Sequence, residues 1–395
     1  MIKTTRDFFL DIDSYQFNKY RQYVSGDVVL THKIKEENRV VTCLSDGLGS
    51  GIKASVLANL TATMALKYTT NYADVSETAE VIMETLPVCK VRKISYSTFT
   101  IIDINGSGHA RVIEHGNPDY VLLRGTEVFQ VPRSPLLLKK WSDREVNISE
   151  FDFHIGDRLV YFSDGISQAG MGLPEYPIGW GRKDVTRHIQ QWIGWEKGIS
   201  SHSLARKIAM HARQIDSFEP KDDITCGVIY LRHPRFLLVV TGPPFSESRD
   251  QELVAQVQSF NGRKVICGGT TAQIVSRELN LEIDMDLENL DPEIPPPSRM
   301  EGIELITEGT ITLSKVAEIL ESSRKPELAR SNAASELVSI LLDSDVIFFL
   351  VGTRVNEAHQ DPNLPVELDI RRNIIKKITS LLEEKYLKET EKRFI

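Results

Sequence analysis

The stretch LSDGLGSG, Leu44–Gly51, sets one carboxylate, Asp46, between an apolar run and three glycines. A second Ser-Asp-Gly sequence, in YFSDGIS at Tyr161–Ser167, follows another apolar run. Glycine has no Cβ, so the backbone at Gly47 and Gly165 can approach a ligand closely. Two such sequences at the ends of predicted strands, far apart in the chain, call for one explanation.

The residues around Asp46 predict a hairpin followed by a helix. DVVLTHKI (27–34) and RVVTCLSD (39–46) are rich in β-branched residues and are joined by the polar turn KEEN, which favours two paired strands. The glycines then break the strand, and a helix is expected from an apolar repeat at helical spacing: Ile52, Val56, Leu60 and Met64. A second helix is expected after Asp74, which is a suitable N-cap.

The rest of the first part alternates β-rich and helical segments. Short strands separated by Gly, Asn-Gly or Pro are expected over residues 96–131, and DRLVYFSDG and DDITCGVIYLRH are two further strands. Helices are expected over 184–195 and 201–215. This pattern predicts an α+β fold class with two sheets and helices outside them.

After His233 the pattern changes to strands that alternate with helices. RFLLVVTGPP, KVICGGTTA, IELITEGT and VIFFLVGT are apolar runs that end in Gly or Thr, and helical segments follow the first three. Such alternation indicates a C-terminal α/β domain with a mostly parallel sheet. The proline-rich stretch 291–302 is expected to be an extended loop, and a charged helix is expected near 369–385. We therefore predict two domains, residues 1–233 and 234–395.

Composition restricts the class of protein. The chain has 395 residues, a net charge of −8, 41% hydrophobic and 26% charged residues, which is ordinary for a globular protein and argues against nucleic-acid or anionic-membrane binding. None of the four cysteines lies in a C-x-x-C pair, so zinc is not expected. Cys43 and Cys226 lie in apolar runs and are expected to be buried and reduced. The N-terminus lacks a signal-peptide core and the longest apolar runs are strand-length, so we predict a cytoplasmic protein.

The acids at predicted strand ends and turns are the candidate functional residues: Asp27, Asp46, Asp164 and the pair Asp222–Asp223. An aspartate before a glycine is often only a turn residue, and the sequence leaves that alternative open for each one. If the acids converge, two bare carboxylates about 4 Å apart repel by roughly 4 kcal/mol at an effective dielectric constant near 20. Oxygen ligands suit hard cations, so two Mg²⁺ or Mn²⁺ ions, with a shared water as nucleophile for a phosphate ester, would explain the cluster.

The motifs also resemble a known family. The series VSGD, LSDGLGSG, GNPDYVLLRG, GDRLVYFSDGI and PKDDIT is similar to the metal-dependent serine/threonine protein phosphatases (protein phosphatase 2C-like), in the bacterial stage II sporulation protein E branch. The resemblance covers roughly residues 1–232. It implies an αββα β-sandwich of two antiparallel sheets with flanking helices, a two-metal site at one edge, and hydrolysis of phosphoserine or phosphothreonine on a protein.

The resemblance also implies roles for individual residues. Asp46 would bridge the two metal ions and is the candidate catalytic residue. Asp27 and the carbonyl of Gly47 would hold one ion, and Asp164 and Asp222 the other. Asp223 stands where the wider family often has Asn, so it is not assigned as a ligand.

One position departs from the family. Many eukaryotic relatives have a histidine, the proposed general acid, where this chain has Leu48, so the leaving oxygen needs another proton source. His115 is a candidate, although a lone histidine beside a glycine turn is more often structural, and Arg21 is more readily explained as a surface residue than as a phosphate clamp. In this branch the helices after the second motif are thought to switch position, which here would involve Gly51–Thr70 and Asp74–Leu86.

The C-terminal turns TGPPFSES, CGGTTAQ and TEGTITLS match no nucleotide-binding fingerprint. Their Gly, Thr and Ser residues either cap helices or present amides and hydroxyls to an anion, so we expect a regulatory domain for a small anionic ligand. The expected partner is a phosphorylated protein, typically an anti-sigma-factor antagonist in this branch. The rival interpretations are a non-enzymatic phosphoprotein-binding module and a metal-dependent hydrolase of small phosphoesters. The oligomeric state stays open, a homodimer included.

Overall fold

The computed structural model describes residues 8–72, 75–85, 97–136, 138, 146–286, 291–322, 332–354 and 366–395. The chain divides into two compact units, which are described separately: Leu10–Arg232, and His233–Ile395 together with the described residues Phe8 and Phe9. Asp74 and Leu86, which belong to the expected second helix and switch segment, lie outside the described residues. Within the described part of the chain, no helix has both the length and the apolar composition needed to cross a membrane.

The first unit contains a six-stranded sheet whose described pairs are antiparallel. Its order is β2-β3-β4-β5-β9-β8. The strands are β2 (Asp27–Ile34), β3 (Arg39–Gly47), β4 (Ser97–Ile104), β5 (His109–His115), β9 (Asn147–Asp152) and β8 (Ser134–Pro135). The predicted hairpin is confirmed, since β2 and β3 pair from Asp27 opposite Asp46 to Ile34 opposite Arg39.

A five-stranded sheet forms the second layer, in the order β1-β11-β10-β6-β7. Its strands are β1 (Phe9–Phe17), β11 (Ile224–Arg232), β10 (Asp157–Phe162), β6 (Val121–Arg124) and β7 (Glu127–Val128). The two sheets meet where the Thr42 hydroxyl lies 3.2 Å from the Tyr161 hydroxyl. Tyr161 fits there because Gly227 has no side chain: a Cβ at that position would lie 2.1 Å from the Tyr161 ring.

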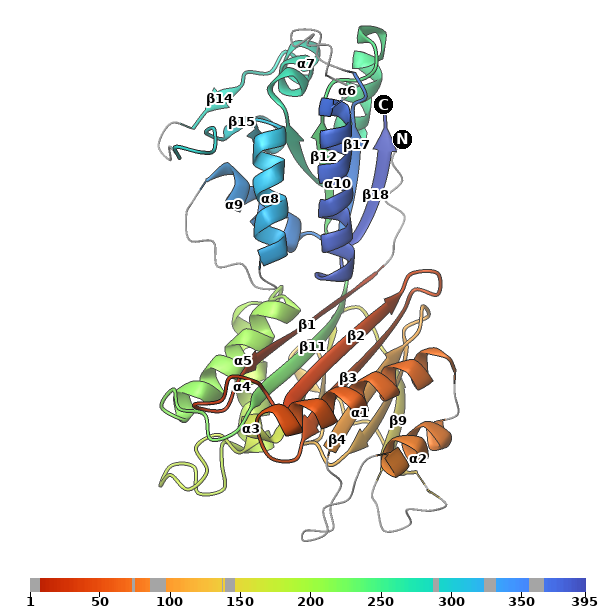
Figure 1. The fold of residues 1–395 in the computed structure, drawn as a ribbon, viewed down its shortest axis with the longest axis vertical. Coiled ribbons are helices and arrows are strands. Elements are labelled where there is room, and N and C mark those ends of the chain that lie inside the picture. The colour runs from red at the N-terminus through yellow and green to blue at the C-terminus, as the bar shows by residue number, and fades with distance from the viewer. Residues whose placement is uncertain are drawn as a thin grey trace. The chain divides into compact units, whose positions relative to one another are not determined.

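Helices cover the outer faces of both sheets (Figure 1). The six-stranded sheet packs its buried residues, such as Val41 and Phe99, against α1 (Ile52–Thr70) and α2 (Val75–Thr85). The five-stranded sheet packs Val160 and Val228 against α3 (Asp164–Ser167), α4 (Gly181–Trp195) and α5 (Ser201–Ile215). The αββα β-sandwich with flanking helices is therefore confirmed.

The helix α1 is confirmed, but its apolar repeat is not its buried face. Ile52, Val56 and Leu60 are 72%, 60% and 41% exposed. The residues that α1 buries are small: Ala54, Ala58, Thr61, Ala62 and Ala65. The reason is close packing on the sheet, because a Cβ at Gly47 would lie 2.1 Å from the Ala54 carbonyl oxygen.

The second unit is an α/β domain with a mostly parallel seven-stranded sheet, in the order β14-β15-β16-β13-β12-β17-β18. Five strands are parallel: β12 (Phe236–Thr241), β13 (Arg263–Cys267), β16 (Ile303–Thr307), β17 (Val346–Val351) and β18 (Glu389–Phe394). The short strands β14 (Asp284–Met285) and β15 (Ser298–Met300) are antiparallel. The expected proline-rich loop is therefore wrong at 298–300, where β15 pairs with β16 on one side and with the edge strand β14 on the other.

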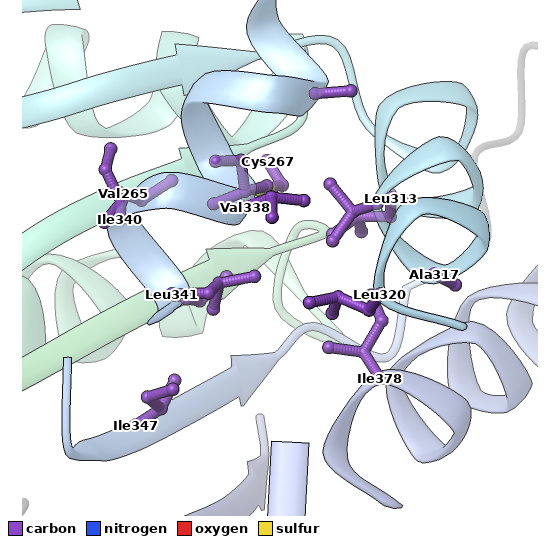
Figure 2. Close-up of a cluster of buried hydrophobic side chains, with 14 of the residues drawn as sticks. Val265, Cys267, Leu313, Ala317, Leu320, Val338, Ile340, Leu341, Ile347 and Ile378 are labelled. Carbon is purple, nitrogen blue, oxygen red and sulfur yellow. The ribbon is translucent and has the colours of Figure 1, made fainter. Parts of the chain in front are cut away.

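Helices line both faces of this sheet. On one face lie α6 (Asp250–Ser259), which follows the short 3₁₀ turn η1 (Glu247–Arg249), and α7 (Gly269–Leu279). On the other lie α8 (Thr310–Ser322), α9 (Ala333–Asp343) and α10 (Val366–Glu384). Figure 2 shows how Leu313, Leu320 and Ile378 from two of these helices meet strand residues such as Cys267 in the core.

The close fit of Tyr161 against Gly227 gives a test of the sandwich. Gly227→Ala should lower the free energy of unfolding by about 1–3 kcal/mol, because the new methyl group overpacks a buried ring. Gly194→Ala is the matched control: a Cβ there meets no atom within 4 Å, so it should be neutral or stabilise α4 by up to about 1 kcal/mol. Urea unfolding of the three proteins measures both changes. Equal stability of Gly227→Ala and wild type would contradict this packing.

Candidate metal centre

The β2–β3 hairpin brings the first two predicted ligands together. Asp27 begins β2 and lies directly opposite Asp46 near the end of β3. Opposite residues of an antiparallel pair project to the same face of the sheet. The backbone carbonyl of Asp46 also accepts a hydrogen bond from the Ser97 hydroxyl of β4, at 3.0 Å. The pairing of β2 with β3 therefore fixes the backbone positions from which both carboxylates project.

Asp164 and Asp222 come from the other sheet. Asp164 is the first residue of α3, just after β10, and Asp222 lies just before β11. These two strand ends are joined because Ser163 donates its amide to the Thr225 carbonyl at 3.0 Å. A Cβ at Gly165 would lie 2.1 Å from the Asp223 carbonyl oxygen, so only glycine lets α3 start this close to the 222–223 segment. The second Ser-Asp-Gly sequence is thus a packing requirement as well as a source of charge.

The carboxylates act on one another electrostatically. Burial, followed by the charges of Asp27, Asp164, Asp222 and Asp223, raises the pKa of Asp46 to about 10. Burial is also the main reason that the pKa of Asp27 rises to about 8, although the nearby Thr225 and Ser163 hydroxyls oppose that rise. Such mutual effects require proximity. The structure therefore brings the predicted acids of both sheets into one neighbourhood.

The other two acids are less buried but respond in the same direction. Burial and the charge of Asp222 raise the pKa of Asp164, while Gln168, which donates to Asp164 Oδ2 at 2.8 Å, opposes the rise. Burial raises the pKa of Asp222, and Lys19, whose Nζ lies 4.0 Å from Asp222 Oδ1, opposes it. For each of the four carboxyl groups, the ionised form is thus less favourable than in water, and a nearby cation would stabilise it.

The donor atoms fit a hard cation. Oδ2 of Asp27 is buried and has no partner at hydrogen-bond geometry among the described residues, so it keeps a free lone pair. The Gly47 carbonyl oxygen lies 3.5 Å from where a Cβ of Gly26 would be, and Asp223 Oδ2 lies 3.1 Å from that point. The side-chain Cβ of Ala54 lies 3.0 Å from the same point, and the proposed ligand atoms, four carboxylates and one carbonyl, are all oxygens, as Mg²⁺ and Mn²⁺ prefer.

The side chains are not yet arranged around a single ion. Within the described ranges, no three Asp, Glu, His or Cys side chains already lie at the spacing of a metal-binding group. The backbone brings the four acidic residues near one another, and their described side chains do not form a ready-made ion site.

Asp223 has a structural role that the sequence did not reveal. Its Oδ1 accepts the Lys19 amide and its Oδ2 accepts the Gly26 amide, both at 2.9 Å. The side chain is almost fully buried. These bonds fasten the turn before β2 to the base of β11, across 204 and 197 residues of sequence, and no local pattern could have indicated them. Each of its oxygens thus accepts one backbone amide, and the omission of Asp223 from the ligand set stays a prediction.

The family is decided by a sequence comparison. The model of the family described as stage II sporulation protein E (SpoIIE) matches residues 36–232. Residues 36–232 therefore belong to the SpoIIE family. Its members are PP2C-type serine/threonine phosphatases, which confirms the predicted enzyme class. Asp46, Gly47, Asp164 and Asp222 lie inside the matched range, and Asp27 lies before it.

Solved structures of this type are also similar to the SpoIIE-family domain. The phosphatase domain of SpoIIE from Bacillus subtilis is 19% identical over 57% of this chain and 93% of that chain, with a TM-score of 0.43. The RsbU and RsbW domains of a Mycobacterium tuberculosis protein are 15% identical over 63% and 67%, with a TM-score of 0.47. RsbX in complex with magnesium is 20% identical over 58% and 100%, with a TM-score of 0.41. No curated protein matches the sequence.

Neither candidate for further catalytic chemistry in the SpoIIE-family domain gains support. The His115 ring packs against the buried Phe99 ring, with 5.5 Å between centroids, which indicates a structural role. Arg21 is exposed and its guanidinium lies 5.1 Å from the Tyr20 ring centroid. Leu48 is half-buried and has no titratable group.

The carboxylate neighbourhood predicts an unusual substitution effect. Asp46→Asn should raise the unfolding temperature of the metal-free protein by roughly 2–8 °C, as a gain of about 1–2 kcal/mol implies. The folded-state pKa of about 10 exceeds the usual 3.8, so the unfavourable contribution of Asp46 is absent below about pH 4 and grows as pH rises. The gain should therefore be larger at pH 8 than at pH 6.

Thermal unfolding with and without Mn²⁺ completes this test. Mn²⁺ should stabilise the wild type and have little effect on Asp46→Asn. An equal Mn²⁺ shift in both proteins would remove Asp46 from the centre.

The Asp223 bonds predict the opposite effect on stability. Asp223→Ala should lower the free energy of unfolding by about 2–4 kcal/mol, because two backbone amides lose a charged acceptor. Asp152→Ala is the control, since its carboxylate is 77% exposed beside His109, and it should change stability by less than about 1 kcal/mol. Similar urea midpoints for the two variants would contradict the role given to Asp223.

Proposed function

We propose that the first unit hydrolyses phosphoserine or phosphothreonine on a protein substrate with the help of two Mn²⁺ or Mg²⁺ ions. The observation that carries this proposal is the gathering of four carboxylates, two from each sheet, with every pKa raised by burial and by at least one neighbouring acid. A cluster of this kind is unfavourable without cations, so its presence is explained if cations bind.

The chain's own residues divide the work as follows. Asp46 would contact both ions, Asp27 and the Gly47 carbonyl would hold one, and Asp164 and Asp222 the other. When bound, the ions would supply a water of lowered pKa and offset the negative charge of the phosphate. Gln168 orients Asp164 through its 2.8 Å hydrogen bond, and the Asp223 bonds keep the turn that precedes Asp27 in place.

Protonation of the leaving oxygen falls to solvent in this proposal. Leu48 occupies the position where many eukaryotic relatives have a histidine, and it carries no proton to donate. The serine or threonine alkoxide would then take its proton from water that reaches the site edge. The absence of a side-chain acid at this position favours substrates whose leaving oxygen stays accessible to solvent.

Helix α1 is the proposed control element of the site. Gly47, a proposed ligand, packs directly against the Ala54 carbonyl of α1. A displacement of α1 would therefore change the position of the Gly47 carbonyl. This contact supports the proposal that the Gly51–Thr70 segment forms or breaks the site as it moves.

The proposed substrate is a small phosphorylated bacterial signalling protein, such as an anti-sigma-factor antagonist. This follows from the family alone. A homodimer and a cytoplasmic location also stay predictions. The retention of all four acids favours hydrolysis over a phosphoprotein-binding module that has lost activity.

Phosphate release from a phosphoserine peptide tests the proposal. The wild type should release phosphate only with Mn²⁺ or Mg²⁺, and Asp46→Asn should fall below about 1% of its rate because one carboxylate organises both ions. Asp152→Asn, on the exposed end of β9, should keep full activity.

Two results would redirect the proposal. Peptide binding without metal-dependent release would identify a binding module. Faster turnover of glucose 6-phosphate or a nucleotide than of the phosphopeptide would identify a small-phosphoester hydrolase.

A further inference from the structure

The amino end of α7, in the second unit, is open and carries no internal negative charge. The segment CGGTT runs from the end of β13 into this helix. The first turn of α7 has no acidic residue, and its N-cap, Gly268, provides no side-chain hydrogen bond. Gly269 and Thr270 are exposed, and a Cβ at Gly269 would meet no atom within 4 Å. Free amides and the helix dipole at such an end attract anions.

A buried hydroxyl points to the same place. Thr271, in the first turn of α7, is fully buried, and its Oγ1 has no hydrogen-bond partner among the described residues. This oxygen lies 3.4 Å from where a Cβ of Gly268 would be, so it faces the mouth of the helix. Buried polar groups are almost always paired. A ligand at the helix end would give Thr271 the partner that the protein does not.

The backbone leaves room for such a ligand. Gly268 has φ 144, in the region that favours glycine, and the next nearest atoms to its absent Cβ are the Gly242 amide nitrogen at 3.8 Å and the Glu308 carbonyl oxygen at 3.9 Å. Three strand-to-helix turns therefore meet here with little side chain between them.

The position agrees with the topology of the sheet. The parallel strands lie in the order β16-β13-β12-β17-β18. From β12 the chain first adds strands on one side, β13 and then β16, and later on the other side, β17 and then β18. Ligands of open α/β sheets bind at the carboxyl ends of strands near such a change of direction. Between β12 and β17 the crevice is filled, because Gly352 donates its amide to Thr241 at 2.8 Å and a Cβ on it would lie 2.0 Å from the Pro243 carbonyl. The carboxyl end of the adjoining strand β13, where α7 begins, is therefore the candidate binding position.

The neighbouring helix shows what α7 lacks. Helix α8 also follows a glycine and has a buried, unpartnered threonine, Thr312, in its first turn. There the Glu308 carboxylate already accepts the Ile311 amide, at 3.1 Å. The amino end of α8 is thus neutralised by the chain itself, and that of α7 is not.

A guanidinium group lies close to the Gly242 turn. Nη1 of Arg371, on α10, lies 2.5 Å from where a Cβ of Gly242 would be, and the Gly242 amide borders the space above Gly268. The Glu308 carboxylate is the nearby negative group, and its bond to α8 holds it at that helix.

We propose that the amino end of α7 binds the phosphate group of a small molecule. The amides of Gly269, Thr270 and Thr271 and the Thr271 hydroxyl would hold the phosphate oxygens, with Arg371 as the neighbouring cation. The site would give the second unit a ligand-binding function that does not depend on the activity of the first.

Binding to the full-length chain, in EDTA so that cations cannot bridge phosphate to the acids of the first unit, tests the proposal. Thermal unfolding and calorimetry are measured with inorganic phosphate, glucose 6-phosphate and ADP at matched ionic strength. At least one should bind and raise the unfolding temperature. Tighter binding of an ester than of free phosphate identifies a phosphorylated metabolite, and equal binding identifies free phosphate as the ligand.

Variants assign the binding to α7. Thr271→Val should weaken it roughly three- to tenfold, through loss of one hydrogen bond, and Thr312→Val, the matched change in α8, should leave it unchanged. Gly269→Glu fits the open space, should stabilise the ligand-free protein by placing a carboxylate at the helix end, and should weaken binding more than tenfold.

Two outcomes would overturn the proposal. One is that none of the three probes binds the wild type. The other is that Gly269→Glu binds them as the wild type does, which stays decisive even if Thr271→Val fails to fold.

Discussion

Acidic residues that the backbone holds close together are the constraint on which the first unit depends. The β2–β3 register holds Asp27 opposite Asp46, and the joined ends of β10 and β11 bring Asp164 and Asp222 from the other sheet. Each pair of backbone positions is held by strand pairing within its own sheet, β2 with β3 and β10 with β11. Protons or cations relieve the repulsion that remains, and the pKa values of all four carboxyl groups are accordingly raised, chiefly by burial.

Tight backbone packing is what makes the arrangement rigid. Gly47 lies against α1 and Gly165 against the 222–223 segment, each with no space for a Cβ. Asp223 then fastens the Lys19–Gly26 turn to the same place with two buried hydrogen bonds. One acid thus stabilises the fold while its neighbours destabilise it. The first unit can hold an unfavourable group of charges because packing and hydrogen bonds around them are favourable.

The sequence revealed those parts of the fold that depend on neighbours in the chain. The hairpin, the Ser-Asp-Gly strand ends and the helices 184–195 and 201–215 follow from local alternation, glycine breaks and helical spacing. The apolar repeat of Ile52, Val56 and Leu60 wrongly predicted the buried face of α1. The sheet lies so close to α1 that only small residues fit between them. The strand β18, ETEKRF, was missed because its sequence shows no apolar alternation; of its residues only Glu389 is buried. Helix α9 was not predicted either. The Asp223 bonds link residues about 200 positions apart, so only the folded chain shows them.

The two units use glycine-marked strand ends for opposite electrostatic purposes. In the first unit, antiparallel strands end in aspartates and in carbonyl groups such as that of Gly47, so oxygen atoms collect and the site suits cations. In the second, parallel strands lead straight into helices, so amides and the Thr271 hydroxyl collect at the amino end of α7 and the site suits anions. The difference follows from topology: a parallel strand-to-helix turn exposes N–H groups, and a strand that ends in acid exposes oxygen. If both proposals hold, a chain that carries both kinds of edge binds a cation in one unit and an anion in the other without sharing a single ligand between them.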